Sequence, residues 1–109
     1  APVGVLLGEG VQRNMKFAVE TLVRHGAKLL TGGHPVSAPG YRFENTLLRV
    51  TGADFLRHPQ LLQTEAFGNA SLVVVAETPD QLLEVARHLE GNLTGSVYSA
   101  TDGSDDPLY

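Results

Sequence analysis

The feature that most constrains the fold of this chain is an unbroken apolar run, Ser71–Ala76, followed at once by a helix start signal. A Leu-Val-Val-Val run of this length is typical of a strand buried on both faces, as in a parallel sheet. In the next segment, Thr78 is expected to cap a helix and Gln81 to complete a capping box. Pro79 fits the first helical position and Gly91 the end. The sequence therefore predicts an α/β fold.

A further strand, residues 94–100 ("TGSVYSA"), is predicted after that helix. Strand, helix and strand over roughly 30 residues make a right-handed crossover unit with two parallel strands. Residues at helical spacing predict that the helix buries one apolar face, made of Leu82, Val85, Ala86 and Leu89.

The rest of the chain predicts one more long helix and two more strands. Apolar residues at helical spacing predict a helix from Glu9 to His25, ended by Gly26. The segments "AKLLTGG" and "TLLRVT" predict strands on either side of the Pro- and Gly-rich loop "HPVSAPGY". "ADFLRHPQLLQ" predicts one or two helical turns, broken before Pro59. Two long helices cover four strands poorly, so we expect the chain either to dimerise or to be part of a larger protein.

Composition narrows the class of protein. The chain has 109 residues, a net charge of −4 and no cysteine. This length suits one small domain or part of a larger one, and the negative charge argues against nucleic acid as a partner. The lack of cysteine excludes disulfides and a cysteine nucleophile within the chain, and it favours a reducing compartment, the cytoplasm. We expect no membrane span and no signal peptide, because the apolar runs are short and the first residues lack a basic leader.

Most candidate sites in the sequence have an ordinary structural interpretation. Metal-ligand spacing is lacking among the histidines, so no metal site is expected; they are His25, His34, His58 and His88. "GEGVQR" is more typical of a plain helix start than of a phosphate loop, and no serine lies in a nucleophile elbow.

Glu65 and Phe67, in the stretch "TEAFGNASLVVV", are the remaining candidates. By residue type alone, a core aromatic and a turn-capping acid are the more ordinary interpretation of the pair. Ligands in α/β folds bind at the carboxyl ends of strands, whereas Glu65 precedes its strand, so that rule does not decide between a structural and a binding role.

Four segments of the sequence, in order, resemble the NAD(P)-dependent aldehyde dehydrogenase superfamily. "TEAFGNASLVVV" resembles the Glu-x-Phe-Gly-Pro motif of that family, and "GAKLLTGG" resembles its Gly-Ala-x-x-x-x-Gly-Gly segment. "GYRFENTLLRVT" resembles its Gly-Tyr-x-x-x-Pro-Thr-x-x-x-x-Val segment, and "GNLTGSVYS" its Tyr-Gly-Leu-x-x-x-Val-Phe segment. "LEGNLTGSVY" and "FGNASLVVV" look most like the branch that oxidises 2-oxoglutarate semialdehyde (2,5-dioxovalerate).

The resemblance implies that residues 1–109 are the C-terminal, incomplete part of an aldehyde dehydrogenase catalytic domain, a mostly parallel sheet with flanking helices. It implies that Glu65 hydrogen-bonds the nicotinamide ribose hydroxyls of NAD or NADP, and that Phe67 packs beside the nicotinamide. Gly68 is expected to let the backbone turn sharply into the strand. By the same resemblance, no catalytic residue and no metal ligand is expected within this chain.

The parent enzyme implied by the resemblance oxidises an aldehyde to a carboxylic acid. A cysteine thiolate attacks the aldehyde, the thiohemiacetal gives hydride to NAD(P)+, and activated water hydrolyses the thioester. The thiolate and the base would lie outside this chain, so the chain alone is expected to bind no cofactor and to be inactive. The implied partners are the rest of the parent enzyme, a small aldehyde and further copies of the enzyme, with neither nucleic acid nor membrane.

Three residues depart from the family pattern. Asn69 and Asn45 replace prolines, and Thr64 replaces a common second glutamate. Two other interpretations stay open. The chain could be an independent small α/β module that binds a ligand or partner without catalysis, or an oligomer-forming domain that pairs through an exposed strand.

Overall fold

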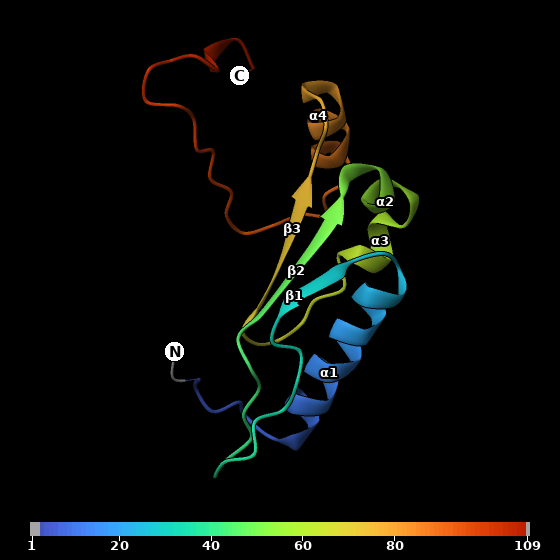
Figure 1. The fold of residues 1–109 in the computed structure, drawn as a ribbon, viewed down its shortest axis with the longest axis vertical. Coiled ribbons are helices and arrows are strands. Elements are labelled where there is room, and N and C mark those ends of the chain that lie inside the picture. The colour runs from blue at the N-terminus through green and yellow to red at the C-terminus, as the bar shows by residue number, and fades with distance from the viewer. Residues whose placement is uncertain (1–2, 109) are drawn as a thin grey trace.

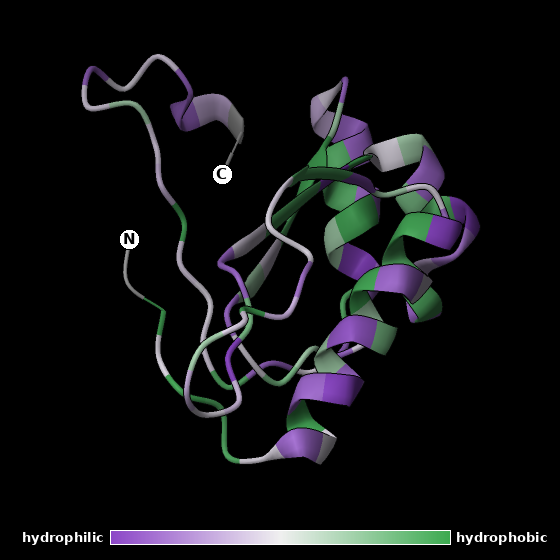
Figure 2. Cartoon of the chain, turned by 60° about the horizontal axis from the view of Figure 1, so that its bottom comes forward, coloured by the Kyte–Doolittle hydropathy of each residue, from purple (hydrophilic) through white to green (hydrophobic). Residues whose placement is uncertain are grey.

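A computed structural model describes residues 3–108 of the chain, which form a three-stranded sheet with helices packed on one side (Figures 1 and 2). The segment that follows the last long helix runs away from this body (Figure 1). The elements, in chain order, are α1 (Glu9–Arg24), β1 (Lys28–Thr31), β2 (Thr46–Thr51), α2 (Gly52–Arg57), α3 (Pro59–Leu62), β3 (Ala70–Val75), α4 (Pro79–Arg87) and the 3₁₀ turn η1 (Asp106–Leu108).

The sheet has the order β1-β2-β3 and mixes the two strand directions. β2 and β3 are parallel, in register from Thr46 opposite Ala70 to Thr51 opposite Val75. β1 runs antiparallel to β2. Two parallel strands need a crossover connection, usually a helix, between them. The pair β2 and β3 has α2 and α3 for this purpose, whereas β1 and β2 are joined by a loop, so the expected parallel pairing holds only for β2 and β3.

The core lies between the sheet and the helices. Met15, Val19 and Leu22 of α1 are buried there together with Leu48 and Val50 of β2. The short helices and α4 each add one buried side chain, which are Phe55, Leu62 and Val85. Apolar burial on this single side is the main stabilising contribution to the fold.

The expectation that Ser71–Ala76 is buried on both faces is wrong. Leu72 and Val74 pack against the core. Ser71 and Val73, which alternate with them along the strand, are exposed, Val73 by 44%. Alternate residues of a strand point to opposite faces, and the helices of the described chain cover only one of these faces (Figure 2).

The predicted strand at residues 94–100 does not form, so the crossover unit lacks its second strand. In the described part of the chain the sheet ends at β3, and residues 94–100 have no regular secondary structure. Their largest side chains, Val97 and Tyr98, are 74% and 91% exposed. A strand is stabilised by backbone hydrogen bonds to a neighbour, and this segment has left the edge of β3 where such bonds could form (Figure 1).

The first helix agrees with the sequence at both ends, since α1 spans Glu9–Arg24 and is followed by the cap residue His25. For α4 the start agrees better than the end. Thr78 Oγ1 accepts a hydrogen bond from Gln81 N at 3.1 Å, and Gln81 Oε1 accepts one from Glu77 N at 2.9 Å, which confirms the capping signal. α4 ends at Arg87 rather than near Gly91. Of its expected apolar face only Val85 is buried, while Leu82, Ala86 and Leu89 are exposed.

Two further features fix the path of the chain around the site described below. α2 and α3 are separate helices that meet at His58, which confirms the break before Pro59. Gly32, after β1, has a φ of +78°, and a Cβ there would lie 2.3 Å from the backbone oxygen of Asn45. Only glycine fits this close approach.

No described helix is both long and apolar enough to cross a membrane.

Candidate functional site

The candidate site is the loop that joins α3 to β3, residues 63–69, which we call the 63–69 loop. Its first residue, Gln63, is fixed by three hydrogen bonds. Gln63 Nε2 donates to Pro59 O at 2.9 Å and to His88 O at 2.8 Å, and Gln63 Oε1 accepts from Glu90 N at 2.7 Å. The loop therefore begins at a point that is tied both to α3 and to the end of α4.

The last residue of the loop, Asn69, is fixed as firmly. Asn69 Nδ2 donates to Phe43 O at 2.9 Å and to Asn45 Oδ1 at 2.8 Å. Its backbone oxygen accepts from Thr46 N at 2.9 Å, where the pairing of β2 and β3 begins. Both ends of the loop are thus held by segments that lie far away in the sequence.

Glu65 and Phe67 lie between these two anchors and are both exposed, Phe67 by 65%. Ala66 between them is partly buried and packs against the core. The three residues belong to no helix or strand, and a bend begins at Phe67. The structure therefore places both predicted residues at the surface, and their contact with a cofactor stays a prediction.

Gly68 lies at the expected turn into the strand, because residues 67–69 form a bend directly before β3. It is not among the glycines with a positive φ, so this turn does not use the left-handed backbone region. A Cβ at this position would lie 3.0 Å from Sδ of Met15, which is itself fully buried. The absence of a side chain lets the loop approach α1 closely.

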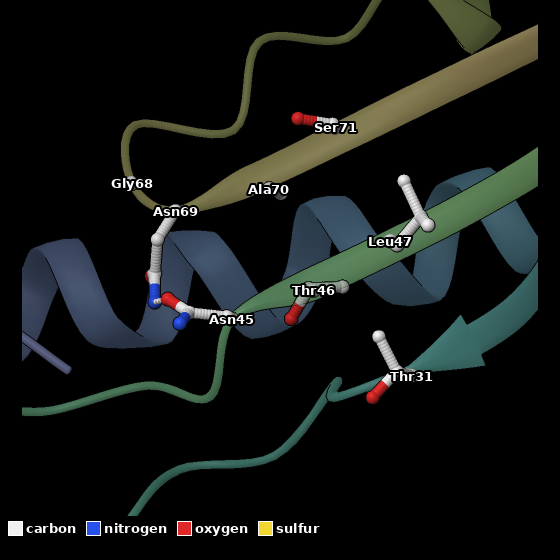
Figure 3. Close-up of a pocket in the computed structure, with 8 residues that line it drawn as sticks. All are labelled: Thr31, Asn45, Thr46, Leu47, Gly68, Asn69, Ala70 and Ser71. Carbon is white, nitrogen blue, oxygen red and sulfur yellow. Dashed lines mark hydrogen bonds between the residues drawn. The ribbon is translucent and has the colours of Figure 1, made fainter. Parts of the chain in front are cut away.

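A shallow polar pocket of about 430 Å³ adjoins the loop at the start of β2 and β3 (Figure 3). Its lining is uncharged and combines hydroxyl and amide groups with small residues: Thr31, Asn45, Thr46, Leu47, Gly68, Asn69, Ala70 and Ser71. Thr46 Oγ1 is already engaged, because it accepts from Gly33 N and donates to Glu44 O. Hydroxyl and amide groups can both donate and accept hydrogen bonds, so the pocket offers hydrogen-bonding groups without a charged side chain.

The sequence does not predict this pocket. It arises where the loop after β1 meets the residues before β2 and β3, and those segments are far apart in the chain. A signal was present, since Asn45 and Asn69 are two of the departures from the family pattern and prove to be neighbours in space (Figure 3).

Three of the histidine rings make their contacts outside the 63–69 loop. The rings of His25 and His58 meet edge to face at 5.4 Å between centroids. His88 Nδ1 is hydrogen-bonded to Glu84 O within its own helix. Among residues 3–108 no cluster of three or more histidine and acidic side chains is placed to hold a metal ion.

Comparison with known proteins connects this geometry to a family. The sequence profile described as "Aldehyde dehydrogenase family" matches residues 2–104. A succinate-semialdehyde dehydrogenase of Paenarthrobacter nicotinovorans is 32% identical over 97 residues, which are 89% of this chain and 21% of that protein. The chain therefore spans about a fifth of the length of this relative.

Solved structures agree with the sequence profile. The crystal structure of lactaldehyde dehydrogenase from Escherichia coli superposes with a TM-score of 0.59 at 28% identity, over 76% of this chain and 17% of that one. A structure of 3,6-anhydro-L-galactose dehydrogenase in complex with NAP also superposes with a TM-score of 0.59 at 28% identity, with the same coverage. The α/β architecture predicted from the sequence is thereby confirmed.

Proposed function

The chain belongs to the aldehyde dehydrogenase family, and from that premise we propose that it is the cofactor-orienting part of an enzyme that oxidises an aldehyde to a carboxylic acid with NAD(P)+. The observation that carries this proposal is the pair Glu65 and Phe67, exposed on either side of the inward Ala66 in a loop anchored at both ends. Two groups that bind a ligand need such a fixed relative position.

Each of the two side chains has a chemical role that suits this position. The Glu65 carboxylate accepts hydrogen bonds only, so it fits a pair of ribose hydroxyls, and an ionised acceptor makes the stronger bonds. The Phe67 ring has few rotatable bonds, and it limits where a flat nicotinamide can lie. When bound, NAD(P)+ accepts the hydride from the substrate. Glu65 and Phe67 hold the orientation in which that transfer is productive.

The remaining chemistry belongs to parts of the complete protein beyond these 109 residues. The chain contains no cysteine, so the nucleophile must come from elsewhere. We propose that this chain is the C-terminal portion of the catalytic domain, and that its partners are the rest of the enzyme, further copies of it and a small aldehyde. The cytoplasm is the proposed location, because nothing in a cysteine-free chain calls for an oxidising compartment.

The substrate we propose is 2-oxoglutarate semialdehyde. "LEGNLTGSVY" and "FGNASLVVV" resemble the branch that oxidises it. The succinate-semialdehyde dehydrogenase similar to this chain is named for another aldehyde that carries a carboxylate. Turnover of the complete natural protein on the two semialdehydes and on lactaldehyde tests this choice, and a preference for lactaldehyde would contradict it.

The role of Glu65 is tested by Glu65→Gln in the complete natural protein. Glutamine keeps the size and removes the charge, so the KM for NAD(P)+ should rise about tenfold, the equivalent of about 1.4 kcal/mol. The KM for the aldehyde should stay the same. Glu77→Gln is the matched control, because Glu77 is equally exposed but follows β3 at its other end. Equal cofactor KM values for the two variants would refute the proposal.

A further inference from the structure

We propose that Asn69 and Asn45 together are the positioning residues of the cofactor loop, an inference that rests on the function proposed above. The amide of Asn69 joins the end of the 63–69 loop to the segment before β2 by its two bonds, to Phe43 O and to Asn45 Oδ1. Figure 3 shows the two amides facing one another across the start of the two strands. The partners lie 26 and 24 residues away in the sequence, so the contact is a true tertiary link.

The orientation of the Asn69 amide is determined by its surroundings. Its Nδ2 faces two oxygens, and the reversed amide would place Oδ1 against those same oxygens, which is repulsive. In the observed orientation Oδ1 is buried without a hydrogen-bond partner. Leaving a buried acceptor unpaired is destabilising. The Asn69 side chain nevertheless adopts the orientation in which Nδ2 donates two hydrogen bonds and Oδ1 has no partner.

This link fixes the part of the loop that carries the binding residues. Asn69 follows Phe67 by two residues, and a Cβ on Gly68 between them would lie 3.0 Å from Sδ of Met15. One of the acceptors, the backbone oxygen of Phe43, belongs to a residue that is fully buried. Asn69 therefore transmits the rigidity of the core to Phe67 and, through Ala66, to Glu65. Without the two side-chain bonds, Asn69 would keep the backbone hydrogen bond that its oxygen accepts from Thr46 N.

The two asparagines stand where the resembling family pattern has prolines. Proline restricts the backbone locally, because its ring fixes φ near −65°. In this chain the separate backbone restraints of two prolines are replaced by one hydrogen bond between the two asparagine side chains. Neither asparagine has a positive φ. Proline requires a negative φ, so the sign of φ at both positions allows proline. Asn45 should consequently matter only while Asn69 is present, whereas Asn69 keeps its bond to Phe43 O when Asn45 is replaced.

Hydrogen exchange measured by mass spectrometry on the complete natural protein tests this coupling. We compare Asn69→Ala, Asn45→Ala, the double alanine variant and the double variant Asn45→Pro/Asn69→Pro. Asn92→Ala is the control, because its side chain bonds only to Glu90 O, two residues away. Asn69→Ala should speed exchange of the peptides that cover the loop about three- to tenfold, the range expected for one net hydrogen bond.

The pattern across the variants decides the outcome. The double alanine variant should exchange no faster than Asn69→Ala, and the double proline variant should restore slow exchange. Asn92→Ala should match the unmodified protein. Additive effects of the two alanines, or unchanged exchange in Asn69→Ala, would overturn the proposal.

Cofactor kinetics on the same variants separate a positioning role from a general loss of stability. Asn69→Ala should raise the KM for NAD(P)+ about three- to tenfold with an unchanged KM for the aldehyde, and the double proline variant should recover the low value. If Glu65→Gln changes the cofactor KM but the asparagine variants do not, the positioning role is refuted and the proposed function stands. If exchange is coupled as expected but Glu65→Gln has no effect, the proposed function fails and only the structural link survives.

Discussion

At the scale of single residues, the site depends on the alternation Glu65, Ala66, Phe67. Ala66 contributes little chemistry, but it packs against the core between the two exposed side chains. The sequence predicted Glu65 and Phe67 as the pair of interest because of the motif they resemble. It could not show that Asn45 and Asn69 meet, because that contact depends on the register of β2 against β3.

One carboxyl group shows how local hydrogen bonds change acidity in this chain. The Ser104 hydroxyl and the Ser104 backbone N–H hydrogen-bond to the Asp102 carboxylate and lower the pKa of that group below its ordinary value of 3.8. A lowered pKa means that the charged form stabilises the turn. This stabilisation is present above the ordinary pKa and is lost as the pH falls through the lowered one.

An NMR titration of the Asp102 side chain checks this pKa shift. Its midpoint should lie below 3.8, and Ser104→Ala should move the midpoint up towards the ordinary value. Ser37→Ala, in the distant loop after β1, serves as the control and should leave the midpoint unchanged. A midpoint that does not respond to Ser104→Ala would contradict the assigned cause.

At the scale of the elements, both ends of α1 and the start of α4 followed from the sequence, whereas the end of α4 did not. Thr78 and Gln81 form their cap within four residues, so local sequence contains the whole signal. The end of α4 involves Gln63, which lies 25 residues before His88. Its side chain donates to His88 O and accepts from Glu90 N, and these are backbone groups that further helical turns would have paired. The missing strand at 94–100 has the same kind of origin, since a strand requires a neighbour that local sequence does not specify.

Gln63→Ala should therefore loosen the junction between α3, the cofactor loop and α4. It removes side-chain bonds to Pro59 O, His88 O and Glu90 N, so we expect a loss of about 1–2 kcal/mol in the free energy of unfolding. Chemical denaturation measures this value. Gln60→Ala, on the exposed side of α3, is the matched control. A loss no greater than that of the control would contradict the role assigned to Gln63.

At the scale of the whole molecule, the helices cover one face of the sheet, and the other face exposes Val73 together with polar neighbours. The chain spans about a fifth of the relative it resembles in sequence. Both facts fit our proposal that this chain packs within a larger catalytic domain. A larger domain that covers the second face of the sheet would also suit the Leu-Val-Val-Val run of β3, because such a run is typical of a strand covered on both sides.

The 109-residue chain by itself should show no aldehyde oxidation. It has no cysteine to act as the nucleophile, and it would contribute only orientation of the cofactor. The measurement is NAD(P)H formation with the aldehyde panel named above, in parallel with the complete natural protein. Turnover by the isolated chain would contradict the division of labour proposed here.

The most direct test of the central claim is an experimental structure of the complete natural protein with NAD(P)+ bound. We predict that an oxygen of Glu65 lies about 2.5–3.0 Å from a ribose hydroxyl of the nicotinamide half, with the Phe67 ring against the nicotinamide. A structure in which the cofactor binds well while Glu65 and Phe67 both face away from it would contradict the account.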